Sequence, residues 1–590
     1  MADVNKKWRY LTTKYWEYTG TDFRYPEEDF RYLETGRGLF DGKEDFGIVI
    51  SGGGTRSATA GFGQLRGLRQ AGILQRAKYL SCNSGGSWVS VPFTFYQGDD
   101  DEFFSPYLPP DAITEESLKV IPDKSFLKSV TKAGVLFRGW SLLPYSGDES
   151  LSKMLGRIFL KRLRIPFKRV IFSLNRDSRD AILEANPRQL GNKDFVLAKE
   201  DRPYLIVNGT LHNRRYADII AAVKKGKLPQ IFAASPDSAF HIEMTPLYAG
   251  VKVHHPNEGD NGQDIGGGYV EPMAFDGVLR SIDDQAKKAE VRLGAKWLPG
   301  IVNRWQRNSR MFTLADMMAI SGSALSPADE IADLPGVKRA IRYLGKPLPL
   351  KVALSLYGPL LNGMPEINHW SIRDAIDGRN VKTNEYNMGD GGQTDNIGLI
   401  PLLARGVKKA IVFINTPTKL KEKDRRIIAD AQVARYFGLD KEHEGVDPRY
   451  QVLEDEEKYK ELVSELFNRG DGAPIFESTY QVKQNNYFGV SGNYEIDIMW
   501  VYLERCMKWE EDLPANISAL IGEKIRVEDP DVVEMYEHNL YEHFPNYWTF
   551  LENFPRVIDL EEEQANLLAN YTTWVIDHYQ DRINAFLSSN

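Results

Sequence analysis

Residues 47–63, GIVISGGGTRSATAGFG, and residues 77–88, AKYLSCNSGGSW, each place a glycine-rich turn directly after a short apolar run. The apolar runs predict buried strands, and the apolar spacing across residues 57–71 predicts a helix that ends at Gly72. A second helix is expected from Gly85 onward. Two successive strand–turn–helix units indicate an α/β fold.

Three further apolar runs extend the predicted sheet, namely residues 203–209 (PYLIVNG), 351–358 (KVALSLYG) and 408–415 (KKAIVFIN). Strands of this kind suit a sheet that is buried on both faces. We therefore predict a mainly parallel or mixed central sheet flanked by helices.

The length of the chain allows one large domain with insertions. We expect residues 1–45 to form an N-terminal arm that packs on a single domain of residues 46–590. A cap insertion is expected at about residues 100–200, and an acidic helical insertion at about residues 418–470. The rest of the C-terminal part is expected to be a helical extension, whose role the sequence does not indicate.

Composition excludes several classes of protein. The 590 residues include 74 Lys and Arg against 82 Asp and Glu, a net charge of −8, so nucleic acid is not an expected partner. Only Cys82 and Cys506 are cysteines, which excludes a disulfide framework and favours a cytoplasmic location. The N-terminus lacks the apolar core of a secretory signal. Residues 348–364 form the most apolar stretch, but Lys351 interrupts it, and we expect a buried strand and a loop there.

The first glycine turn does not fit a nucleotide-binding loop. SGGGTRS, residues 51–57, lacks the lysine and the glycine spacing of a phosphate-binding loop. No acidic residue ends the predicted strand at 77–82 to bind a ribose hydroxyl. We therefore do not expect a nucleotide at this turn.

The second turn has the pattern of a nucleophile elbow. A strand, then Asn83-Ser84-Gly85-Gly86, then a helix would hold the serine on a tight turn with its hydroxyl projecting. The pattern G-x-S-x-G would require glycine where Cys82 stands, and cysteine is small enough for the turn.

The first turn could supply backbone donors to such a serine. Gly53 and Gly54 carry no side chains, so their N–H groups could approach a tetrahedral oxyanion. Arg56, at the start of the next helix, has a fork of donors suited to phosphate. The alternative for Arg56 is an ion pair with a surface carboxylate.

A candidate base lies far downstream, in NMGDGGQTDN, residues 387–396. Asp390 precedes two glycines where a strand is expected to end, a place where aspartate is usually only a turn residue. None of the nine histidines lies in a strongly patterned loop of the kind that a triad uses. Asp390 is therefore the candidate base by its motif, and His369 stays open as a member of a Ser–His–Asp arrangement.

Taken together, SGGGTR, NSGGSW and DGG resemble the patatin-like and cytosolic phospholipase A2 superfamily, above all its cytosolic phospholipase A2 and lysophospholipase branch. Four further stretches add to the resemblance, namely HIEMTPLYAGV (241–251), GGGYVEPMAF (266–275), ISGSALSPA (320–328) and, more weakly, ENFPRVIDL (552–560). Cys82 and Gly398 depart from it, because they stand where the family has glycine and proline.

The resemblance implies a Ser–Asp dyad, with Ser84 as nucleophile and Asp390 as base. It further implies Gly53 and Gly54 as oxyanion donors and Arg56 as the group that meets the substrate phosphate. The activity implied is hydrolysis of phospholipid or lysophospholipid esters at membrane surfaces. Acyl transfer by the same residues and a catalytically silent lipid-binding protein are the alternatives.

One stretch is strongly basic. Residues 119–176 hold 13 Lys and Arg against three Asp and Glu, with six Phe and Trp among them. We interpret this stretch as a cap that presents cations to an anionic membrane and aromatic side chains to the interface. The alternative is a solvated helical surface. About 45 residues precede the first turn, too few for a calcium-binding β-sandwich of roughly 100 residues, so we expect no metal or other cofactor.

Overall fold

The computed structural model describes most of the chain, with gaps. The residues described are 10–20, 23–133, 150–213, 239–259, 262–293, 311–323, 365–379, 381–423, 426–439, 448–522, 541, 543–547 and 560–589. The predicted strand at 351–358, the apolar stretch 348–364 and the motif at 552–560 lie outside these residues.

A mixed sheet forms the centre of the molecule, as predicted. Its parallel part consists of β6 (Tyr204–His212), β3 (Ala77–Cys82), β2 (Glu44–Ile50), β16 (Lys409–Ile414) and β20 (Tyr494–Tyr502), in that spatial order. The apolar side chains of these strands are buried on both faces. The predicted strands at 47–50, 77–82, 203–209 and 408–415 are thereby confirmed.

Antiparallel strands extend this core on both sides. Beyond β20 lies β19 (Ile475–Val482). Beyond β6 follow β7 (Ala239–Met244), β8 (Ala249–Gly250), β11 (Gly268–Val270), β1 (Leu11–Glu17), β13 (Lys288–Arg292) and β12 (Val278–Asp283). β15 (Asn384–Asp390) also pairs with β6, and β14 (Glu366–His369) pairs with β15. In the described residues this sheet has 14 strands.

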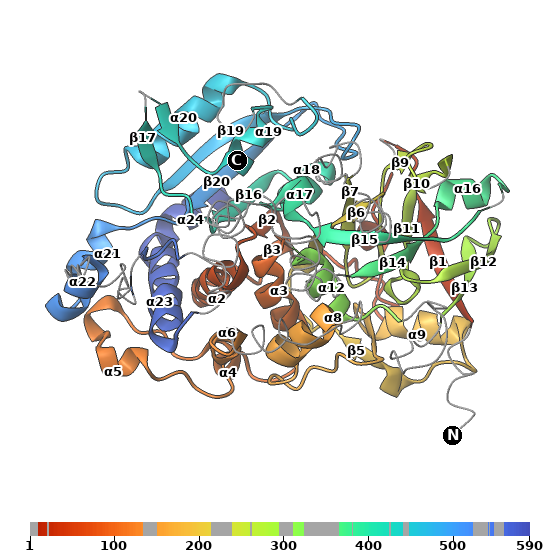
Figure 1. Ribbon diagram of the computed structural model, residues 1–590, viewed down its shortest axis with the longest axis horizontal. Coiled ribbons are helices and arrows are strands. Elements are labelled where there is room, and N and C mark those ends of the chain that lie inside the picture. The colour runs from red at the N-terminus through yellow and green to blue at the C-terminus, as the bar shows by residue number, and fades with distance from the viewer. Residues whose placement is uncertain are drawn as a thin grey trace, which may run out of the picture.

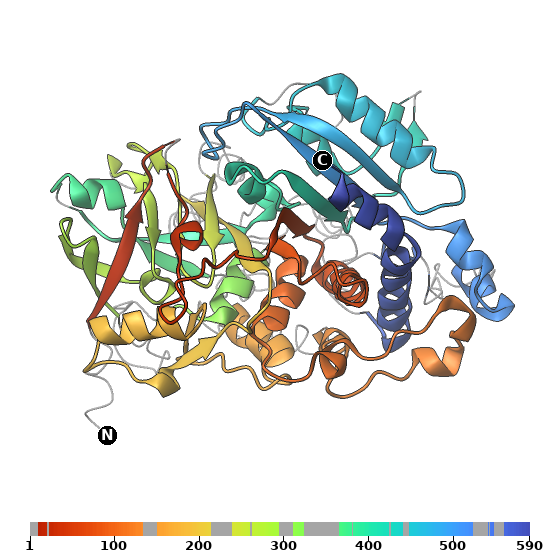
Figure 2. The same ribbon diagram turned by 180° about the vertical axis from the view of Figure 1, so that it is seen from behind.

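The N-terminal residues contribute to the sheet as well as packing on it. β1 pairs with both β11 and β13 at the end of the molecule near the N-terminus (Figures 1 and 2). Glu27, in α1 (Pro26–Asp29), is fully buried and forms an ion pair of 2.8 Å with Arg405, which also contacts Glu243 at 2.7 Å. Segments far apart in sequence are thus joined by buried charge.

Helix α2 (Gly54–Gln70) packs against α23 (Glu562–His578), about 500 residues further along the chain (Figures 1 and 2). A Cβ atom on Gly63 would lie 2.2 Å from the carbonyl oxygen of Ala569, and one on Gly67 would lie 2.6 Å from Cβ of Ile576. The two glycines therefore permit this close approach. Helix α23 therefore packs directly on α2 as part of the same layer of helices.

The described residues of the region predicted as a cap form short elements on the side of α2 and α3 (Gly85–Phe95). They are α4 (Asp100–Phe104), α5 (Glu115–Leu118), α6 (Leu127–Val130), α8 (Ser150–Leu155), the π-helical turn η2 (Gly156–Leu160), β4 (Ile171–Ser173), α9 (Arg176–Ala185) and β5 (Phe195–Leu197). Short 3-10 turns lie at Pro110–Ala112, Asn192–Asp194 and Pro272–Ala274.

Three of the six Phe and Trp side chains in residues 119–176 face the core, so our interpretation of these three as interfacial side chains is wrong. Phe137 and Trp140 lie outside the described residues. Phe126, Phe159 and Phe172 are each fully buried. Phe159 stacks on Trp88 and on Phe126, with ring centroids 5.5 and 5.7 Å apart. The aromatic residues follow the burial that their apolar area favours, and the charges remain outside.

The remaining elements complete the two ends of the sheet. One end holds β17 (Lys421–Lys423), β18 (Arg426–Ile428), α19 (Ala431–Tyr436) and α20 (Glu456–Phe467), within the region predicted as an acidic insertion. The other holds β9 (His254–His255), β10 (Ile265–Gly266) and α16 (Ile372–Ile376). Further helices are α12 (Leu314–Ser321), α17 (Gly392–Asp395), α18 (Ile400–Ala404), α21 (Met507–Glu511), α22 (Ala515–Gly522) and α24 (Gln580–Ser588). Among the described residues, none of the helices combines the length and the apolar composition that a membrane-spanning segment requires.

Candidate active site

Ser84 occupies a sharp turn between β3 and α3. Its backbone has φ 45° and ψ −123°, a strained conformation for a residue with a side chain. A Cβ on Gly85 would lie 1.9 Å from the carbonyl oxygen of Gly54, and one on Gly86 would lie 2.4 Å from that of Ile50. Small residues after the serine are therefore required for the two turns to pack together, as the elbow pattern predicts.

The order of the strands brings Asp390 to this turn. Cys82 at the end of β3 pairs with Val207 of β6, and Gly209 of β6 pairs with Asp390 at the end of β15. β7 occupies the other edge of β6 along residues 207–212, so β3 and β15 share one edge, and their carboxyl ends face each other about two residues (about 7 Å) apart along β6. Asp390 and the turn that follows β3 are therefore close enough for direct contact.

Ser84 and Asp390 are joined by a hydrogen bond, although 306 positions separate them. The hydroxyl of Ser84 donates to Oδ2 of Asp390 at 2.8 Å, and the N–H of Gly392 donates to Oδ1 at 2.7 Å. Burial raises the pKa of the Asp390 carboxyl from 3.8 to about 7, and these two hydrogen bonds act in the opposite direction. A carboxyl group with this pKa is suited to exchange protons near neutral pH.

The first glycine turn lies against the same serine. A Cβ on Gly52 would lie 3.1 Å from Cβ of Ser84. Among the described residues, no hydrogen bond is donated by the N–H groups of Gly53 and Gly54. Helices α2 and α3 both begin here, so the positive ends of two helix dipoles meet near Ser84. The arrangement is suited to stabilise negative charge beside the serine.

Arg56 lies in the interior, and not in a surface ion pair. The residue is 2% exposed, its Nε donates to the carbonyl of Asn415 at 3.1 Å, and its Nη1 donates to the carbonyl of Tyr547 at 2.6 Å. A Cβ on Gly53 would lie 2.8 Å from Nη2 of Arg56. Two of the three guanidinium nitrogens are thus engaged with the main chain, and the third lies beside the glycine turn.

His369 is bonded elsewhere. Its Nε2 accepts from the N–H of Gly266 at 3.1 Å, and burial lowers the pKa of its imidazole to about 4. On β14 it pairs with Asn384, at the far end of β15 from Asp390, about 20 Å away along the strand. His369 therefore does not form a triad with Ser84 and Asp390 in this conformation.

Several supporting residues were not identified from the sequence. The hydroxyl of Ser321 accepts from the N–H of Ser84 at 2.9 Å, and the hydroxyl of Thr210 donates to the carbonyl of Asp390 at 2.8 Å. Ser321 lies within the ISGSALSPA motif, which was therefore the signal that could have found it. Thr210 follows the predicted strand at 203–209, and Asn415 is the last residue of the predicted strand at 408–415. The sequence identifies these strands only by their apolar residues, so it gives no signal for the polar residues at their ends.

Cys82 is a packing residue under the elbow. It is fully buried, and burial raises the pKa of its thiol to about 12, so the thiol is unreactive at neutral pH. Cys506 is also buried, and both cysteines are free. Within the described ranges, no group of three or more His, Cys, Asp and Glu side chains could hold a metal ion.

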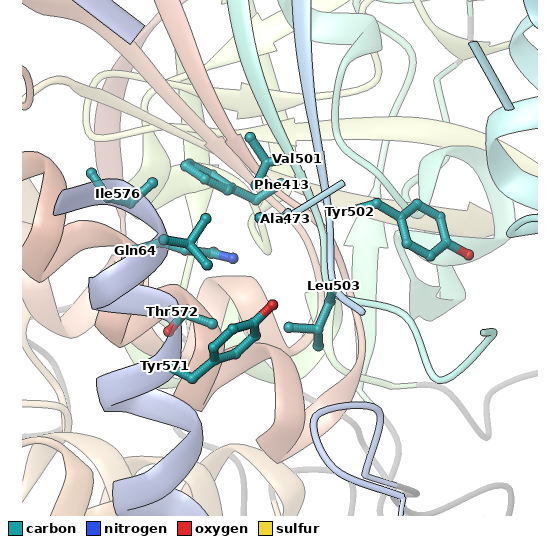
Figure 3. Close-up of a pocket in the computed structure, with 10 residues that line it drawn as sticks. Gln64, Phe413, Ala473, Val501, Tyr502, Leu503, Tyr571, Thr572 and Ile576 are labelled. Carbon is teal, nitrogen blue, oxygen red and sulfur yellow. The ribbon is translucent and has the colours of Figure 1, made fainter. Parts of the chain in front are cut away.

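A small cavity lies on the other side of α2, between α23 and the ends of β16 and β20 (Figure 3). It is lined mainly by apolar side chains, including Phe413, Leu503 and Tyr571, and by the carboxamide of Gln64. Neither Ser84 nor Asp390 lines it, so it is separate from the candidate active site.

The scan against protein-family models gives no match, and neither does the comparison with curated proteins. Solved structures of human GIVD cytosolic phospholipase A2 do match, one at 13% identity with a TM-score of 0.42. Two more structures of this protein are complexes with methyl gamma-linolenyl fluorophosphonate. The complex that also contains terbium chloride matches at 12% identity with a TM-score of 0.35, and the other matches at 11% identity with a TM-score of 0.37. The alignments cover 93% to 94% of this chain, which spans 60% of the length of each structure that it matches.

Proposed function

We propose that this protein is a lipid acyl hydrolase that cleaves carboxylic esters of phospholipids or lysophospholipids through Ser84 and Asp390. The observation that carries the proposal is the 2.8 Å hydrogen bond between Ser84 Oγ and a buried Asp390 whose pKa is about 7. A hydroxyl bonded to a carboxylate of this pKa can lose its proton as it attacks an acyl carbonyl. The attack gives a tetrahedral intermediate, which expels the alcohol part of the lipid as that oxygen takes the proton from Asp390. Water then cleaves the remaining acyl-enzyme, which releases the fatty acid and restores Ser84.

Acyl transfer also requires hydrogen-bond donors that stabilise the oxyanion of the tetrahedral intermediate, and the glycine turn is suited to provide them. We assign this role to the N–H groups of Gly53 and Gly54, beside Ser84 and at the start of α2. One such donor is worth about 3–4 kcal/mol of barrier. Closure of the site over a long acyl chain would exclude water and strengthen these interactions.

Arg56 is the proposed phosphate-binding residue of this scheme. Its Nε and Nη1 donate to main-chain carbonyls, and a Cβ on Gly53 would lie 2.8 Å from its Nη2, so the phosphate would meet the guanidinium beside the glycine turn. We retain phosphate binding by Arg56 as a proposal in that form. It requires that the phosphate approach over the glycine turn.

The proposed membrane contact is confined to a basic ridge. We use this name for five exposed basic residues on η2 and in the segment that follows it, and within the described residues no ion pair involves any of them. They are Arg157, Lys161, Arg164, Lys168 and Arg169. By contrast, Lys124, Lys128 and Arg162 of the same basic stretch are paired with carboxylates. We propose that the ridge binds anionic lipid headgroups, at about 1 kcal/mol for each cation near the surface.

The test is a product analysis of mixed phospholipid vesicles in water labelled with oxygen-18. Wild-type protein should release fatty acids that carry one labelled oxygen, at a rate that rises with pH through about 7 as Asp390 loses its proton. Ser84→Ala and Asp390→Asn should reduce release at least about 1000-fold. Ser90→Ala, at a buried serine of the same helix, is the matched control and should have little effect.

Other outcomes of this test separate the alternatives. Transfer of the acyl chain to added glycerol or lysophospholipid, in place of water, would indicate an acyltransferase. Binding of vesicles without product from wild-type protein would indicate a silent lipid-binding protein. The proposed chemistry uses no metal ion, so a chelator should leave turnover unchanged.

A further inference from the structure

The glycine turn of the candidate active site needs an external support. Gly52, Gly53 and Gly54 form a segment without side chains, and Gly53 and Gly54 have φ of 137° and 57°. Glycine in such conformations has much conformational freedom to lose. Donors to an oxyanion are effective only when they are held in place before the reaction. Some part of the fold must therefore fix this turn.

Asn415, one residue past the end of β16, contacts both ends of the turn. Its N–H donates to the hydroxyl of Ser51 at 2.8 Å, directly before the three glycines. Its Nδ2 lies 3.3 Å from the hydroxyl of Ser57, three residues after them, and that hydroxyl donates to the carbonyl of Ser51 at 2.5 Å. Asn415 therefore fixes the two positions between which the glycines run.

The remaining polar groups of Asn415 are also engaged. Its side chain exchanges two hydrogen bonds with the carboxamide of Gln64, of 2.8 and 3.2 Å, on the α2 face seen in Figure 3. Its carbonyl accepts from Nε of Arg56 at 3.1 Å. Asn415 is fully buried, so a lost partner could not be replaced by water at the surface.

The contact with the glycine that is assigned to the oxyanion hole is direct. A Cβ on Gly53 would lie 2.6 Å from the carbonyl oxygen of Asn415, so the backbone of Gly53 packs on that carbonyl. A displacement of Asn415 would therefore move Gly53 with it.

We infer that Asn415 is a positioning residue that aims the N–H groups of Gly53 and Gly54 at the carbonyl group attacked by Ser84. This inference rests on the proposed function. If Asn415 has this role, turnover depends on the C-terminal end of β16 as well as on the residues of the site itself.

The test compares Asn415→Ala with Asn570→Ala. Asn570 is a matched control, because it is also fully buried and bonds to Arg66 and to the N–H of Leu108 at the α2–α23 interface. Both variants should lower the melting temperature. Only Asn415→Ala should lower kcat, about 10- to 100-fold with KM little changed, when assayed well below its melting temperature.

Amide hydrogen exchange gives a readout that does not depend on activity. In Asn415→Ala, a peptide that covers residues 51–57 should exchange faster than in wild type, and in Asn570→Ala it should not. Asn415→Asp, which keeps the acceptor for Gln64, should lie between wild type and Asn415→Ala in kcat.

The failure of this inference can be distinguished from failure of the proposed function. If wild-type turnover does not depend on Ser84, the proposed function is wrong and this inference with it. If turnover depends on Ser84 but Asn415→Ala and Asn570→Ala change kcat and exchange equally, only the positioning role of Asn415 is overturned.

Discussion

Replacement of the buried carboxylate of Asp390 should make the protein more stable at neutral pH. Burial raises its pKa from 3.8 to about 7, and each unit corresponds to about 1.4 kcal/mol, so the ionised group costs the folded state about 4 kcal/mol. Because the folded state holds this proton more tightly than the unfolded chain, the stability contributed by this group falls as pH rises from about 4 to about 7. Asp390→Asn is neutral at every pH and avoids this loss.

The comparison is made by urea unfolding of both proteins at pH 5 and pH 8. The stability of Asp390→Asn relative to wild type should increase by about 2–3 kcal/mol between these pH values. Asp395→Asn is the matched control, because this buried carboxylate accepts from the N–H groups of Gly398 and Ile400 and from the hydroxyl of Tyr436. Its replacement should destabilise the protein at both pH values. A difference between Asp390→Asn and wild type that does not change with pH would refute the reasoning.

Three further predictions concern the backbone, the buried charges and the surface. Ser84→Gly should be about 1 kcal/mol more stable than Ser84→Ala, because only glycine adopts φ 45° without strain; equal unfolding midpoints would contradict this. Glu27→Ala should cost about 3 kcal/mol in urea unfolding, since it removes a buried partner of Arg405, and a loss below about 1 kcal/mol would show that the pair is not important. Lys161→Ala with Arg164→Ala should weaken binding to anionic vesicles about 25-fold at low salt and little at high salt. Affinity that is insensitive to salt would exclude the ridge as a binding surface.

Sequence patterns point to candidate site residues where local geometry requires particular residue types. The elbow around Ser84 and the turn around Gly53 are recognisable because only small residues allow the two turns to pack together. Asp390 becomes a candidate only through the combination of DGG with the other two motifs, because an aspartate before glycines is by itself usually a turn residue. The environment of Arg56 could not be predicted, because its partners are carbonyl groups, which every residue carries.

Long-range packing is the part that the sequence does not reveal. The basic stretch and its aromatic residues look like one amphipathic surface in the sequence, but Phe126 and Phe159 stack in the core while Lys161 and Arg164 remain outside. The packing of α23 on α2 depends on Gly63 and Gly67, which in the sequence are merely small residues within a helix. Periodicity identifies an apolar face but not the element that covers it.

The central claim is that Ser84 is a nucleophile activated by Asp390, and covalent labelling with an alkyl fluorophosphonate tests it most directly. The reagent phosphonylates an activated serine with loss of fluoride, and mass spectrometry of the digested protein locates the adduct. We predict a single adduct on Ser84 that forms at least about 100-fold more slowly in Asp390→Asn. An adduct on another residue, or labelling of Asp390→Asn at the wild-type rate, would contradict the claim.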